Sequence, residues 1–114
     1  MKISKYNIKG VNLSKLTNLL KDNQDINQYF KQLSESAVIL ASETYYFRID
    51  SDLLSIVFLN FISDNECEVE IISGGGKGGA FFLSLGSEEN RNKNIYNRLK
   101  NICESNSWII EIIE

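Results

Sequence analysis

The sequence predicts a single α+β domain spanning residues 1–114, built as a two-layer sandwich with helices on one face of an antiparallel sheet of five to six strands. Three observations predict this class. Helical apolar periods lie toward both ends of the chain, strand-like alternation fills the middle, and Gly, Asn, Asp and Ser separate the strands. A chain of 114 residues can form a core without metal or disulfide staples.

The first third of the chain predicts one strand followed by helical structure. Residues 2–9 are expected to form the strand, and Asn12 or Ser14 can cap the helix after it. A second apolar arc over residues 26–33 begins at Asp25, which has capping-box spacing to a Gln, and predicts a second short helix or a bent continuation. The leucines of the first helix share one arc of about 120°: Leu13, Leu16, Leu19 and Leu20.

The middle of the chain predicts an antiparallel meander. Residues 37–41 and 45–50 have strand patterns, and residues 50–52 form a turn. Residues 53–62 are apolar on both faces, as expected of a central strand that is covered on both sides. Residues 66–71 alternate between acidic and apolar side chains, which is typical of a half-exposed strand.

The last third predicts a strand at residues 80–85, a helix at 88–105 capped by Ser87, and a terminal strand at 108–113. The terminal strand is apolar on both faces, and an edge strand of that kind invites pairing. We therefore expect it either to insert beside another strand or to form a homodimer contact with a second copy.

The glycine-rich stretch at residues 73–79 has two interpretations. It predicts a mobile hairpin between two strands, or a turn whose backbone N–H groups and lysine bind an anion. The P-loop pattern fails, because Ile71 stands where it needs Gly and Gly78 stands where it needs Ser or Thr. An exposed tyrosine offers apolar area with a polar group. The candidate binding residues are Gly74, Gly75, Gly76, Lys77 and Tyr46.

No catalytic or metal-binding motif is present, so we expect neither an enzyme nor a cofactor or metal. Glu68 and Glu70 share one strand face about 7 Å apart, but such a pattern is more typical of a solvated sheet face than of an acid–base pair. Cys67 and Cys103 lie on apolar faces in a chain without histidine, which predicts buried, reduced thiols.

Charge argues against nucleic-acid binding. The net charge is −3, the isoelectric point is near 5.0, and the cationic residues of the last helix, Arg91 and Arg98 against Lys93 and Lys100, occupy opposite sides of it. We interpret these four as a solvated helix surface. The chain shows no signal peptide and no membrane-spanning segment, so a cytoplasmic location is expected.

Part of the chain resembles a family of small uncharacterised α+β proteins of low-GC Gram-positive bacteria. The resemblance covers about residues 53–102 and rests on three features, the run Ile71–Gly76, the segment Ala80–Phe82 and the acidic helix start at Glu88. It implies a strand, glycine turn, aromatic strand and helix in that order. The family has no assigned activity, so the resemblance implies no catalytic residue.

These observations favour a small non-catalytic binding or regulatory protein that acts through protein–protein contact or self-association. One alternative is an immunity or phage anti-defence inhibitor whose acidic and aromatic groups cover a basic target site. Another is a small-molecule or anion binder that uses the glycine-rich turn. Abundant Asn, Lys and Ile are typical of an AT-rich bacterial or phage coding sequence.

Overall fold

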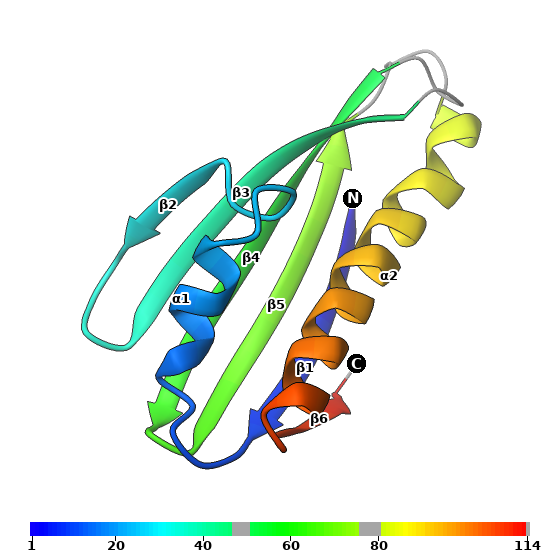
Figure 1. Cartoon of the computed structure of the whole chain (residues 1–114). Helices are drawn as coiled ribbons and strands as arrows, with labels where there is room; N and C mark the ends of the chain where they lie inside the picture. Colours follow the sequence, from blue (N-terminus) through cyan, green and yellow to red (C-terminus); the bar gives the residue numbers. More distant parts are fainter. Residues whose placement is uncertain (47–50, 76–80, 114) are drawn as a thin grey trace.

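The computed structural model describes residues 1–46, 51–75 and 81–113, and it has the predicted α+β architecture (Figure 1). One antiparallel sheet forms the first layer and the helices form the second. In chain order the described elements are β1 (Lys2–Lys9), α1 (Lys15–Lys21), β2 (Tyr29–Gln32), β3 (Ala37–Tyr46), β4 (Ser51–Ser63), β5 (Glu66–Gly75), α2 (Phe81–Ser105) and β6 (Ile109–Ile112).

Among the described residues the sheet has six strands in the order β2-β3-β4-β5-β1-β6, and all neighbours are antiparallel. Strands β3, β4 and β5 form the predicted meander, and β1 lies between β5 and β6. The predicted terminal strand therefore pairs inside its own sheet. The two edge strands have four residues each. Such short edges offer little backbone for pairing with another sheet edge.

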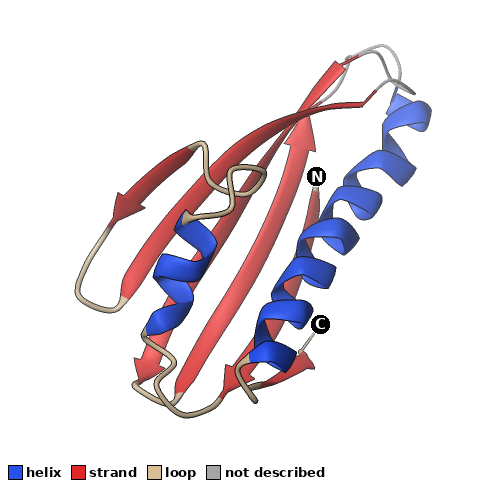
Figure 2. Ribbon diagram, viewed as in Figure 1, coloured by secondary structure: helices blue, strands red, loops and turns tan. Residues whose placement is uncertain are grey.

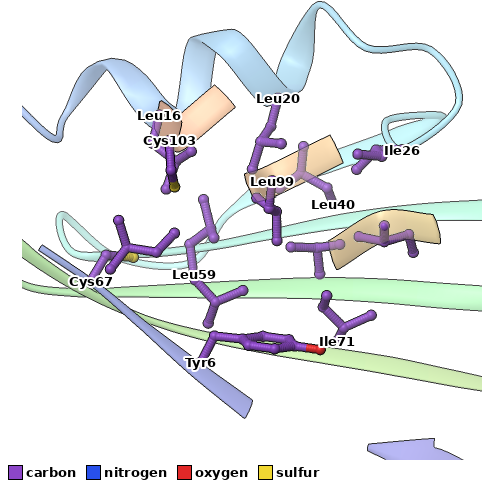
Figure 3. Packing of buried hydrophobic residues seen from close by; sticks show 14 of the residues in the cluster. Tyr6, Leu16, Leu20, Ile26, Leu40, Leu59, Cys67, Ile71, Leu99 and Cys103 are labelled. Carbon is purple, nitrogen blue, oxygen red and sulfur yellow. The ribbon is translucent and has the colours of Figure 1, made fainter. Parts of the chain in front are cut away.

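Both helices lie on one face of the sheet, as Figure 2 shows. In Figure 3, Leu16 and Leu20 of α1 point toward the strands, and Leu99 and Cys103 of α2 lie in the same buried cluster. These four side chains are fully buried. Their helical spacing gives each helix one apolar side, and burial of that side stabilises the domain by roughly 1.5–3 kcal/mol for each large side chain.

The predicted helix at residues 26–33 is wrong. A turn at residues 22–27 leads instead into β2, which pairs with β3 so that Tyr29 lies opposite Ala41. Phe30 packs against the core while Tyr29 is exposed on the other face, which is the two-residue period of a strand. A short apolar segment fits the period of a helix as well as that of a strand. Here the edge of β3 offers hydrogen bonds to a strand, and the segment is therefore a strand.

The predicted strand at residues 80–85 is also wrong, because α2 already begins at Phe81. Strand β5 has β4 on one side and β1 on the other, so the sheet has no place for another strand beside it. The glycine-rich stretch therefore joins a strand to a helix and not two strands. Ser87 is a buried residue inside α2 and not its cap.

Two smaller predictions change in the meander. The strands predicted at 37–41 and 45–50 belong to one strand, β3, as far as Tyr46, and residues 47–50 lie outside the described part of the chain. Of the turn predicted at 50–52, Ser51 and Asp52 belong to β4. The helix predicted at 88–105 is confirmed as the main part of α2.

Trp108 joins the end of α2 to the end of β1. Its side chain is buried, and its Nε1 donates a hydrogen bond to the carbonyl oxygen of Val11 at 2.8 Å. The indole lies so close to Gly10 that a Cβ atom there would stand 2.1 Å from Trp108 Cδ1. Only glycine leaves room for this ring.

Replacing Gly10 with Ala should lower the free energy of unfolding by roughly 1–3 kcal/mol or more, because the added methyl group displaces the Trp108 ring. Urea unfolding followed by tryptophan fluorescence measures the loss. Gly74→Ala is the matched control, since a Cβ there meets its nearest atom at 3.8 Å. Equal stabilities of the two variants would contradict the steric argument.

Candidate functional site

The sheet face opposite the helices is not covered by any described residue. The pairing of adjacent strands places one apolar side chain from each of five strands in a line across this face. We term this line the apolar row: Tyr29, Ala41, Ile56, Ile72 and Ile3. Tyr29 is 57% exposed and Ile3 is 44% exposed. The prediction that β4 is covered on both sides is therefore wrong for the described chain, although its composition is that of a doubly covered strand.

Charged and amide side chains lie beside the apolar row on the same face. In the next row of cross-strand neighbours, Glu70 lies between Phe58 and Lys5. In the row after that, Glu68 lies between Asn60 and Asn7. Lys5 Nζ lies 3.8 Å from Glu70 Oε1. Strand β5 thus presents carboxylates to the open face, while β1 presents amino and amide groups.

A hollow of about 280 Å³ lies over these residues. It is lined by Lys5, Tyr6, Phe58, Asn60, Glu68, Val69, Glu70 and Ile113. The Glu68–Glu70 pair considered from the sequence therefore lies on an open surface, with an ammonium group beside one carboxylate and an aromatic ring nearby. Aromatic anchors among polar groups are the mixture found at protein–protein interfaces.

A second concavity of about 460 Å³ lies beside α1, on the helix-bearing side of the sheet. Its lining is Ser14, Thr17, Gln32, Glu35, Ser36, Phe61, Ser63 and Asp64. Hydroxyl groups dominate it, and its two carboxylates belong to Glu35 and Asp64. In the described part of the chain, no group of three or more His, Cys, Asp or Glu side chains is placed to hold a metal ion.

Arg91 is buried, which contradicts its interpretation as part of a solvated helix surface. Only 2% of it is exposed, and its Nη2 donates to the Asp25 carbonyl oxygen at 2.7 Å and to Ser42 Oγ at 3.1 Å. Its Nη1 lies 3.2 Å from Asp25 Oδ2, and Arg98 Nη2 reaches the same carboxylate at 3.0 Å. Asp25 thus joins two cations of α2 to the turn before β2 and does not cap a helix.

A polar layer continues from Arg91 across the sheet beneath the first half of α2. Ser42, Ser55 and Ser73 are buried and in register on β3, β4 and β5, with 2.8 Å between the Ser55 and Ser73 Oγ atoms. Asn92 Nδ2 donates to Ser4 Oγ at 3.0 Å on β1. Serines at core positions of otherwise apolar strands were the sequence signal for this layer.

The candidate residues of the glycine-rich stretch lie only partly within the described chain, so their joint binding role stays a prediction. Gly74 and Gly75 end β5, where they lie opposite Leu54 and Leu53. The backbone of Tyr46 pairs with Ser51, and nothing further is described for this tyrosine. Gly76 and Lys77 lie outside the described residues. A φ of +116° makes Gly75 a position that favours glycine.

Both cysteines are free and fully buried, as predicted. Burial raises the pKa of the Cys67 thiol to about 12 and the pKa of the Cys103 thiol to about 11. In Figure 3, Cys103 lies close to Leu16 and Cys67 lies toward the strands. These thiols pack as small apolar side chains, since the thiolate and not the thiol is the nucleophile.

Comparisons with protein-family models, curated proteins and solved structures found no match. The resemblance to small Gram-positive proteins stays a prediction. None of the described helices is both long and apolar enough to span a bilayer.

Replacing Arg91 with Ala should lower the free energy of unfolding by about 3 kcal/mol, because the half-buried Asp25 carbonyl and the buried Ser42 hydroxyl lose a charged donor. Chemical denaturation measures this change. Arg98→Ala is the matched control: it removes a pair to the same carboxylate from a side chain that is 47% exposed, and should cost less than about 1 kcal/mol. Equal losses would contradict a special role for Arg91.

The buried thiols should make stability fall at alkaline pH. Above about pH 9 the unfolded thiols ionise while the folded ones stay protonated up to about 11 and 12, so the unfolded state loses protons first. Each thiol should lower the free energy of unfolding by up to roughly 1.4 kcal/mol per pH unit in this window. Denaturation of wild type and the Cys67→Ala/Cys103→Ala variant between pH 8 and about 11 tests this, and equal slopes would refute it.

Proposed function

We propose that this chain is a small, non-catalytic, cytoplasmic protein-binding module whose open sheet face is its contact surface, used for a protein partner or for self-association. The observation that carries the proposal is the apolar row, which crosses five strands without cover from any described residue. Monomeric proteins rarely expose large contiguous apolar patches, and such patches commonly mark interaction sites.

The chemistry around the apolar row supports a protein as the occupant. Leu54 is 49% exposed and Tyr45 is 55% exposed on the same face, so the apolar surface extends along the strands as well as across them. Burying such surface stabilises a complex by roughly 25 cal/mol for each Å² removed from water. Nearby carboxylate, amide and ammonium groups supply the polar contacts that select a partner and set its orientation.

One observation favours a second candidate function, an immunity or anti-defence inhibitor that covers a basic site. Three glutamates of β5 and one of β6 point to the open face, where Glu70 lies beside Phe58: Glu66, Glu68, Glu70 and Glu111. This arrangement would suit a basic target, because complementary potentials speed association and select the partner. An anion-binding role for the glycine-rich stretch stays a prediction.

A photo-crosslinking amino acid at Phe58 tests the binding function in living cells. It should give protein adducts, either with another protein or with a second copy, because Phe58 lies within the proposed contact surface. The same group at Lys100, exposed on α2, is the matched control and should give few adducts. Equal adduct yields at both positions, or no protein adduct at Phe58, would contradict the proposal.

A further inference from the structure

We propose that the open face binds a second copy of this chain around a two-fold axis that runs between β5 and β1, parallel to both strands. This inference rests on the proposed function and names its partner. Rotation about such an axis lays β1 of one copy over β5 of the other, and β6 over β4. The rotation does not move a residue along the axis. Each residue therefore faces, on the second copy, the cross-strand neighbour that lies equally far on the other side of the axis.

Residues that lie opposite one another on β4, β5, β1 and β6 form rows across the open face. The row through Glu70 and Lys5 is self-complementary under this rotation. Reading from β4 to β6, this row is Phe58, Glu70, Lys5 and Ile113, where the Ile113 amide donates to the Lys5 carbonyl oxygen at 2.9 Å. The rotation therefore places Glu70 over Lys5 of the second copy, and Phe58 over Ile113. Each acid meets a base, and each apolar side chain meets an apolar side chain.

The neighbouring rows of residues are also complementary under this rotation. The row Asn60, Glu68, Asn7 and Glu111 places each acid over an amide. On one side of these rows Ile72 meets Ile3, and on the other side Glu66 meets Lys9. Two facing sheets pack about 10 Å apart, and the twist of each sheet carries its outer strands out of alignment, so the residues of β5 and β1, which lie next to the axis, are opposed most directly.

Other positions of the axis fail on the same residues. An axis along β5 would oppose Glu70 to its own copy, and an axis along β1 would do the same for Lys5. An axis between β4 and β5 would press the Glu70 carboxylate onto Phe58. Like charges in contact and charges buried against apolar groups are both costly, so the axis between β5 and β1 is favoured.

The contact also explains the composition of two strands. Strand β4 is apolar on a face that no described residue covers. Ile109 and Glu111 of β6, and Ile113 directly after it, face the same side. Ile109 is 64% exposed and Ile113 is 54% exposed. A second copy would cover Phe58 with Ile113, so β6 takes part in dimerisation through its outward side chains and not through its free edge.

Charge exchange between two variants tests the geometry. Wild type should dimerise at roughly micromolar concentrations in sedimentation equilibrium. Lys5→Glu alone and Glu70→Lys alone should each weaken the dimer by at least about a hundredfold, because each creates two like-charge contacts. An equimolar mixture of the two variants should dimerise again, since every contact between copies then joins Glu to Lys. Lys100→Glu on α2 is the control and should leave the dimer unchanged.

The mixture distinguishes an interface from a change within one chain, because each variant keeps its own like-charge pair between β1 and β5 in every mixture. If either variant fails to fold, Asn7→Cys mixed with Glu68→Cys replaces the test. A bis-maleimide linker of about 10 Å should then join position 7 of one copy to position 68 of the other.

Several results would overturn the dimer. Wild type that stays monomeric up to several hundred micromolar excludes it, and so do variants that dimerise as wild type does or fail to recover on mixing. Crosslinks from Phe58 to a different protein, with a monomeric chain, would reject the second copy and retain the binding function. Absence of any protein crosslink would reject the binding function itself.

Discussion

Both described helices pack on one face of the sheet formed by the six described strands, and this one-sided packing governs the rest of the molecule. The strands carry apolar residues on both faces, yet α1 has 7 residues, α2 has 25, and both lie on the same side. The opposite side keeps Ile56, Phe58 and Ile72 without cover from any described residue. The surface that we propose for binding is therefore a direct consequence of where the helices dock.

Under the helices, polar contacts determine how α2 lies on the sheet. Apolar packing around Leu99 is non-directional and would tolerate small shifts of the helix. The hydrogen bonds of Arg91 to the Asp25 turn and to Ser42, and of Asn92 to Ser4, are directional and hold α2 against β3 and β1 at one position along its axis. A buried guanidinium in this place therefore links the helix, the turn before β2 and the sheet.

The open face owes its charge pattern to strand register. Lys5 meets Glu70 because β1 and β5 pair antiparallel in one register, and a slip of one residue would turn Lys5 toward the core and Tyr6 toward solvent. The same buried residues that fix the register, Tyr6 and Ile8 on β1, therefore also fix the arrangement of charges on the opposite side. Successive side chains of a strand point to opposite faces of the sheet. The same pairing of β1 with β5 therefore determines both the packing of the core and the chemistry of the proposed contact surface.

The sequence by itself determined the α+β class, the strands at 2–9 and 66–71, the helix at 88–105 and the burial of both thiols, because each depends on a local period that long segments express clearly. Tertiary structure decided the secondary structure of the short apolar segments 26–33 and 80–85, because their patterns fit a helix as well as a strand. Part of the first became strand β2, and the second, from Phe81 on, became the start of α2. It also decided the role of Arg91, whose partner Asp25 is 66 residues away. Whether the second sheet face is covered depends on where the helices dock, and no local pattern contains that information.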